Sequence, residues 1–117
     1  MEHNEKLKLL ALKFIQLVPQ RANQYAMERL FGKAWLMPNE IFDALHELVK
    51  DNKLFVGEVK YGVEYYTIAP GLDEYLNSDD VIVETETFAQ EIDKSCFLQH
   101  LLRLARGVDQ EQPDMHD

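Results

Sequence analysis

The sequence predicts one α+β domain made of three helices, a two-stranded β-hairpin and an added C-terminal helix. Three observations predict it. Apolar residues recur at helical spacing three times in the first 50 residues, two short runs of β-branched and aromatic residues then follow, and a longer helical pattern begins at Phe88. A chain of 117 residues is long enough to bury one core without disulfides, and its single cysteine, Cys96, excludes an intrachain disulfide.

The first two helices are predicted at residues 4–18 and 23–31. Leu7, Leu10 and Phe14 fall on one face of the first helix, which Asn4 is placed to cap and Pro19 to end. Asn23 is the expected N-cap of the second helix, and Gly32 is expected to close it in the left-handed conformation. In the connector that follows, Trp35 is expected to fill the core between helices, the alternative being an exposed aromatic anchor for a partner.

Pro38 suits the first position of a third helix, and Asn52 suits the left-handed residue that ends it. Its expected buried stripe is formed by Ile41, Leu45, Leu48 and Val49, with Phe42 beside them. Its expected outward face is formed by Asn39, Glu40, Asp43, Ala44, Glu47 and Lys50.

The hairpin is predicted from the runs LFVGEV and VEYYTI, which are separated by Lys60, Tyr61 and Gly62. Glycine fits the turn position that requires a positive φ. Pro70 and Gly71 end the second strand, and LDEYL begins a short helical segment.

The acidic excess lies in the last third of the chain. Residues 1–70 hold nine basic and nine acidic side chains, whereas residues 71–117 hold three basic and twelve acidic ones. Residues 77–87 are predicted as an acidic linker or an extended strap. Thr87 and Gln90 form a capping-box pattern that opens a helix at 88–107, and the polar tail at 108–117 is predicted to be disordered.

No pattern of catalytic or metal-binding residues is present, so we expect no enzyme activity, no metal and no cofactor. The four histidines lack metal-ligand spacing, the glycines are isolated, and Cys96 with His100 one turn away lacks any accompanying oxyanion-forming segment. No apolar run is long enough to span a bilayer, so we expect a cytoplasmic protein with no membrane contact.

The succession IFDALHELVKDNKL, a hairpin and then YYTIAPGLDEYL resembles the winged helix-turn-helix superfamily, in particular small bacterial transcriptional regulators. The resemblance covers residues 1–76, which it identifies as a winged-helix domain. It implies that the third helix enters the major groove of DNA and that the hairpin tip contacts the backbone or minor groove. Carried onto this chain, it implies DNA contacts from Lys33, Asn39, Asp43, Ala44, Glu47, Lys50, Lys60 and Tyr61.

Two functions remain open. The first is a bacterial or phage-type transcriptional regulator that binds DNA as a homodimer through the C-terminal helix, with the contacting residues Phe88, Ile92, Phe97, Leu98, Leu101, Leu102 and Ala105. The alternative for these residues is packing on the first helix of the same chain. The second function is a winged-helix module that binds another protein and not DNA, because the carboxylates of the third helix would repel phosphates. Clustering of Arg21, Arg29, Lys33, Lys50 and Lys60 on the surface of the third helix would favour DNA.

Overall fold

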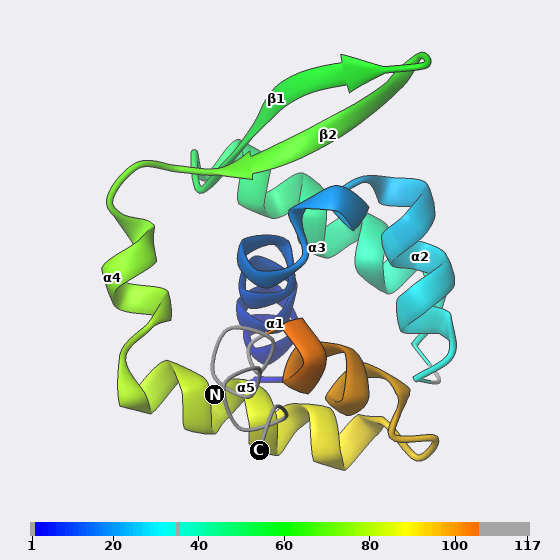
Figure 1. The fold of residues 1–117 in the computed structure, drawn as a ribbon, viewed down its shortest axis with the longest axis vertical. Coiled ribbons are helices and arrows are strands. Elements are labelled where there is room, and N and C mark those ends of the chain that lie inside the picture. The colour runs from blue at the N-terminus through cyan, green and yellow to red at the C-terminus, as the bar shows by residue number, and fades with distance from the viewer. Residues whose placement is uncertain (1, 35, 106–117) are drawn as a thin grey trace, which may run out of the picture.

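The computed structural model describes residues 2–34 and 36–105, which form six helices and one antiparallel hairpin in an α+β fold (Figure 1). The α+β class is therefore as predicted. The elements follow in the order α1 (His3–Leu17), a turn of 3-10 helix (Pro19–Arg21), α2 (Gln24–Gly32), α3 (Pro38–Lys50), β1 (Leu54–Lys60), β2 (Val63–Ile68), α4 (Leu72–Leu76), α5 (Asp79–Ile92) and a last helical segment at 97–105.

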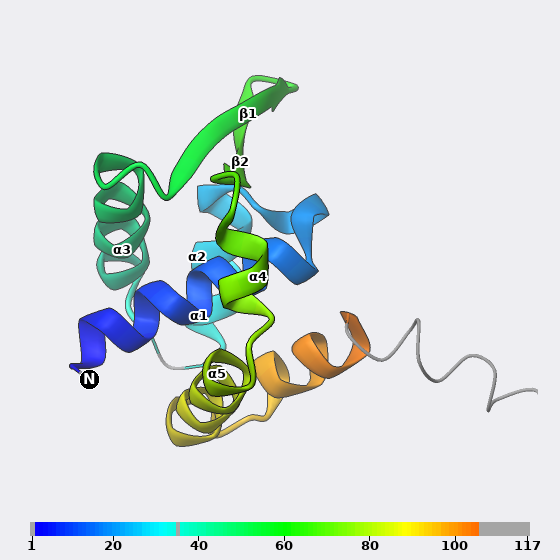
Figure 2. The ribbon, with the colours of Figure 1, turned by 90° about the vertical axis from the view of Figure 1, so that its left-hand side faces the viewer.

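Helix α1 lies at the centre of the fold, with α2, α3 and α5 around it (Figures 1 and 2). Leu7, Leu10 and Phe14 are fully buried along it, which confirms the first predicted helix. The helix ends at Leu17, just before the predicted terminator Pro19. The predicted cap was wrong, because Glu2 occupies the N-cap position and Asn4 lies inside the first turn.

Helix α2 begins as predicted, since the Asn23 side-chain oxygen accepts a hydrogen bond from the Ala26 backbone N–H at 2.8 Å. The residues before it join the hairpin: Asn23 forms a bridge with Tyr65, and the Tyr66 N–H donates to the Ala22 carbonyl at 2.7 Å. The prediction for Gly32 was wrong. Gly32 is the last helical residue and is not among the residues with positive φ, because right-handed backbone continues into Lys33.

Helix α3 passes directly into the hairpin. Pro38 is its first residue and Asn52, at a φ of 62°, follows its end, both as predicted. Strands β1 and β2 pair with Lys60 opposite Val63, so Tyr61 and Gly62 form a two-residue turn with φ values of 52° and 78°. Two positive φ angles match the right-handed twist of a hairpin, which explains the glycine and confirms the predicted turn. The pairing skips Gly57, so a bulge bends β1.

Helix α4 spans the segment LDEYL, as predicted. The prediction of an extended linker at 77–87 was wrong, because α5 already begins at Asp79. Val81, Thr85, Phe88 and Ala89 are buried at helical spacing, and α5 packs against α1 with this face. Its two acidic residues in the first turn suit the positive end of a helix dipole.

The predicted continuous helix at 88–107 was also wrong, because α5 ends at Ile92 and a new helical segment starts at 97. Thr87 therefore lies inside α5 and caps nothing. Asp93 causes the break: its buried carboxylate accepts from the Phe97 and Gln99 backbone N–H groups, both at 3.0 Å, as an N-cap does. The predictions for Trp35, for residues 106–107 and for the tail at 108–117 lie outside the described residues.

Candidate nucleic-acid interface

The outward face of α3 differs from the predicted one by a rotation about the helix axis. Ala44, predicted to face outward and contact DNA, is fully buried. Phe42 and Val49, predicted for the buried stripe, are exposed. Because α3 packs on both α1 and α2, its core-facing side is set by two neighbours, and the small side chain of Ala44 allows close approach. The exposed residues of α3 that share this outward face are Asn39, Phe42, Asp43, His46, Val49 and Lys50.

Two of the three predicted outward carboxylates of α3 are turned toward α1. A Glu40 oxygen lies 3.1 Å from the His3 Nε2, and the other Glu40 oxygen accepts the Met37 N–H at 2.8 Å. A Glu47 oxygen lies 3.3 Å from the Lys8 Nζ. The charge of α3 is therefore partly compensated from within the chain, and Asp43 is the acid that remains on the outward face.

The carboxylates near Lys8 change the pKa of its ammonium group. Burial alone would lower the pKa of its ammonium, but hydrogen bonds and charges from Glu5 and Glu47 outweigh that effect and leave the pKa raised above its ordinary value. Lys8 is thus fully charged at neutral pH, and it joins α1 to α3 through Glu47.

The outward side chains of α3 have the chemistry that reads base edges. An Asn amide pairs with adenine, a carboxylate accepts from cytosine N4, and an aromatic ring contacts the thymine methyl group. The rings of Phe42 and His46 are stacked, with centroids 5.8 Å apart. Sequence reasoning missed Phe42 and Val49 because their spacing fits a buried stripe equally well. It placed His46 on the exposed flank of the helix but not among the DNA contacts.

The hairpin tip presents the two residues predicted for it. Tyr61 is fully exposed in the turn. Lys60 lies 5.4 Å from the centre of the Tyr65 ring, and its Nζ is 3.2 Å from a Glu58 oxygen. Because both Lys60 and Glu58 are well exposed, this pair is weak and Lys60 can exchange Glu58 for another anion at little cost.

Of the five basic residues whose clustering would favour DNA, Lys33 lies apart from the outward face of α3. Lys33 lies 5.5 Å from the centre of the Phe97 ring, at the end of α2 that faces away from the hairpin (Figure 1). Among the described residues, Arg21, Arg29 and Lys50 make no ion pair. Lys50 lies on the outward face of α3 and Lys60 at the hairpin, so these two are the cations best placed beside the outward face.

The predicted dimerisation residues contribute to the core of the same chain. Phe88, Leu98 and Leu102 are buried, and Ile92, Phe97, Leu101 and Ala105 are partly buried against that core. Intramolecular packing, the alternative considered for them, therefore accounts for their apolar character. Leu104, on the same segment, is about half exposed.

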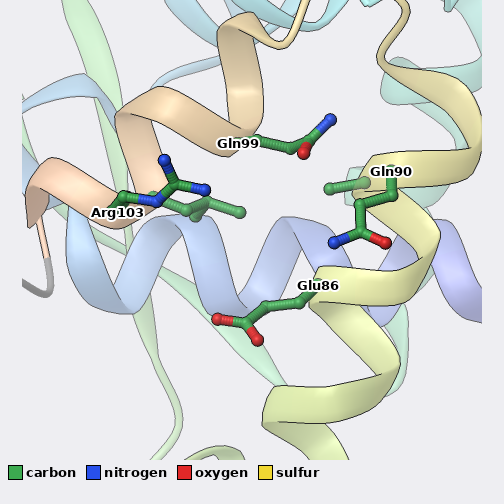
Figure 3. Close-up of a pocket in the computed structure, with 6 residues that line it drawn as sticks. Glu86, Gln90, Gln99 and Arg103 are labelled. Carbon is green, nitrogen blue, oxygen red and sulfur yellow. The ribbon is translucent and has the colours of Figure 1, made fainter.

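A polar cleft of about 180 Å³ lies between α5 and the segment at 97–105 (Figure 3). Glu86 and Gln90 project toward it from α5, and Gln99 and Arg103 project from the last segment. Ala89 and Leu102 complete its lining.

Within the described residues, no three His, Cys, Asp or Glu side chains are grouped so that they could hold a metal ion. The helices in this part of the chain are all too short or too polar to cross a membrane. Comparisons with known proteins found no match, whether among family models, curated proteins or solved structures.

Proposed function

We propose that this chain is a winged-helix protein that binds duplex DNA with α3 in the major groove and the hairpin on the backbone. The order of elements supports the first part. The chain has a helix, a short bridge at Asn23, two further helices and then a hairpin paired to that bridge, which is the order we expect for a winged helix. In such proteins the third helix and the hairpin are the DNA-contacting elements.

The observation that carries the proposal is the outward face of α3. With Glu40 and Glu47 held by α1, this face offers Asn39, His46 and Lys50 to base edges and phosphates, and one carboxylate, Asp43. Helix α3 stands along an outer edge of the molecule with the hairpin above it (Figure 2), so both elements are accessible. As a regulator the protein would act as a dimer, and that state stays a prediction.

The decisive measurement is fluorescence anisotropy of a labelled random duplex, titrated with the full chain at several salt concentrations. Each phosphate contact contributes about 0.9 to the slope of log K against log salt. Lys50→Ala should reduce this slope by about one. Lys94→Ala is the matched control, because Lys94 is exposed in the turn after α5, far from the hairpin (Figure 1), and should leave the slope unchanged. Equal slopes for both variants, or no binding at low salt, would refute the proposal.

Sequence preference is tested separately by selecting duplexes from a random library. Asn39→Ala should then weaken binding to the selected site by about 1 to 3 kcal/mol while sparing random duplex, because an Asn amide reads adenine and contributes little to non-specific affinity.

A second candidate, docking of another protein, is favoured by one observation. The large apolar side chains exposed on α3 and the hairpin are Phe42, Val49, Phe55, Val56, Val59 and Tyr61. Exposed apolar surface of this kind marks protein contacts. If Phe42→Ala abolishes a pull-down partner that Lys50→Ala retains, and the unaltered chain does not bind DNA at low salt, the second candidate replaces the first.

A further inference from the structure

We propose that the cavity between α1, α3 and α4 binds a small amphipathic carboxylic acid, its hydrocarbon part held by leucines and its carboxylate facing Lys53. The proposal concerns a site separate from the outward face of α3 and stands without the proposed DNA function.

The cavity has apolar walls from three elements. Leu9 and Leu12 come from α1, Leu48 from α3 and Leu72 from α4. Leu9, Leu12 and Leu48 are almost wholly buried and form the floor of the cavity, so most of the apolar surface open to a ligand comes from the partly buried Leu72 and the exposed Tyr75. Pockets lined mainly by apolar side chains, with a few polar groups that fix orientation, are the usual form of a small-molecule site.

The size of the cavity limits the ligand. Its volume is about 210 Å³. Pockets for drug-sized ligands begin at roughly 300 Å³. The cavity therefore suits a single short hydrocarbon chain or one ring with a small polar group.

The polar rim sets the charge of the ligand. Lys8 contributes to the rim, but Glu5 and Glu47 each approach its Nζ at 3.3 Å and satisfy its charge. Lys53 follows α3 directly, and its ammonium makes no ion pair among the described residues. The aromatic ring of Tyr75, about half exposed, lies at the same rim. An anionic head group is thus drawn to the Lys53 side and away from Glu5.

Figure 1 shows the three elements that form the walls, with α4 on one side of α1 and α3 on the other. Because Leu48 belongs to α3, a bound acid would touch the helix that carries the proposed DNA face. The ligand would reach Leu48 from the inner side of that helix.

Octanoate is a suitable probe, titrated into the full chain by isothermal calorimetry, with octanol and octylamine as comparators of equal chain length. We expect saturable binding of octanoate at one site and weaker binding of the other two. Lys53→Gln should weaken octanoate binding about 1.5- to fivefold, the range of a solvent-exposed ion pair. Lys60→Gln is the matched control, because Lys60 is an exposed lysine on the hairpin, and it should leave the affinity unchanged.

A filling variant, Leu72→Trp, should reduce octanoate affinity at least tenfold, and its circular dichroism and thermal melt establish that it is folded. If Leu72→Trp does not fold, the octanoate affinities of Lys53→Gln and Lys60→Gln still test the proposal. Three outcomes would overturn the proposal: no octanoate binding, octanol binding as tightly as octanoate, or equal effects of Lys53→Gln and Lys60→Gln. None of these measurements uses DNA, so their failure is distinct from failure of the proposed function.

Discussion

The α3 and hairpin region and the C-terminal helices are held in place in different ways. Strands β1 and β2 are joined by two residues, and the Lys53 N–H donates to the Leu48 carbonyl at 2.9 Å, so α3 and the hairpin are tied to their chain neighbours in addition to their contacts with α1 and α2. Helix α5 packs instead on α1, and the Ser95 hydroxyl donates to the Lys33 carbonyl, 62 residues away in sequence.

This difference bears on function. Phe42, His46 and Lys50 lie exposed on the outer side of α3, so they remain available to a partner. The apolar face of the C-terminal helices is packed into the core, so these helices support α1. Variants that loosen one region should therefore spare the other.

The largest effect is expected at Asp93. In Asp93→Ala the Phe97 and Gln99 N–H groups lose their acceptor, whereas the Ser95 hydroxyl keeps the Lys33 carbonyl as an acceptor. Loss of a charged cap with several hydrogen bonds should lower the free energy of unfolding by about 3 kcal/mol. Urea denaturation measures this change, and hydrogen exchange should accelerate at the Phe97 and Gln99 amides more than in the hairpin.

Lys94→Ala is the control for this experiment, since Lys94 is exposed beside Asp93 and should change stability by less than about 0.5 kcal/mol. If Asp93→Ala lowered the free energy of unfolding by as little as the control, the Asp93 cap would not be what holds the last helical segment in place. Faster hydrogen exchange throughout the hairpin would show that the two regions are not independent.

A smaller effect is expected at the hairpin turn. Gly62 has a φ of 78°, where a Cβ atom is strained, so Gly62→Ala should lower the free energy of unfolding by about 1 to 2 kcal/mol. Space is not the reason, because an added Cβ would meet nothing within 4 Å.

Gly32→Ala provides the matched control, because Gly32 is also open to an added Cβ but is helical. There alanine should stabilise the chain by about 0.5 kcal/mol through helix propensity. Thermal melts of the two variants should shift in opposite directions. A shift in the same direction would mean that the turn conformation of Gly62 is not what limits stability there.

The same division explains what the sequence could predict. Pro38, Asn52 and Gly62 act through their own backbone geometry, so the limits of α3 and the hairpin turn were predicted correctly. The exposure of Asn39, Asp43, Lys50, Lys60 and Tyr61 followed from those limits.

The remaining features depend on residues distant in sequence. Thr85 is a polar residue, but its hydroxyl donates to the Val81 carbonyl at 2.9 Å, which allows the side chain to be buried. A polar residue at a buried position obscured the helical spacing of the apolar residues in α5. Ala44 is buried and Phe42 exposed because α1 and α2 select the inner side of α3. Periodicity gives a helix its faces but does not say which neighbours cover them.

Alkaline pH gives the smallest test of the comparison, because both groups with a raised pKa, Tyr66 and Lys8, belong to or contact the α3 and hairpin region. Burial raises the pKa of the Tyr66 hydroxyl at the hairpin, and the charges of Glu64 and Glu28 add to this. The Lys8 ammonium, which joins α1 to α3, also has a raised pKa. A raised folded pKa means that the folded chain holds its proton longer, so stability is full below the ordinary values of 10.0 and 10.5 and falls as pH rises through the folded values.

Urea denaturation at a series of alkaline pH values should therefore show a falling free energy of unfolding. Tyr66→Phe removes a group that ionises and should flatten the part of this fall that begins near pH 10.0. Lys8→Met should flatten the later part and leave the earlier part in place. Lys94→Met, an exposed control, should follow the parent chain. If Tyr66→Phe keeps the full early fall in the free energy of unfolding, deprotonation of Tyr66 is not coupled to folding, and the stability of the hairpin does not depend on that phenol.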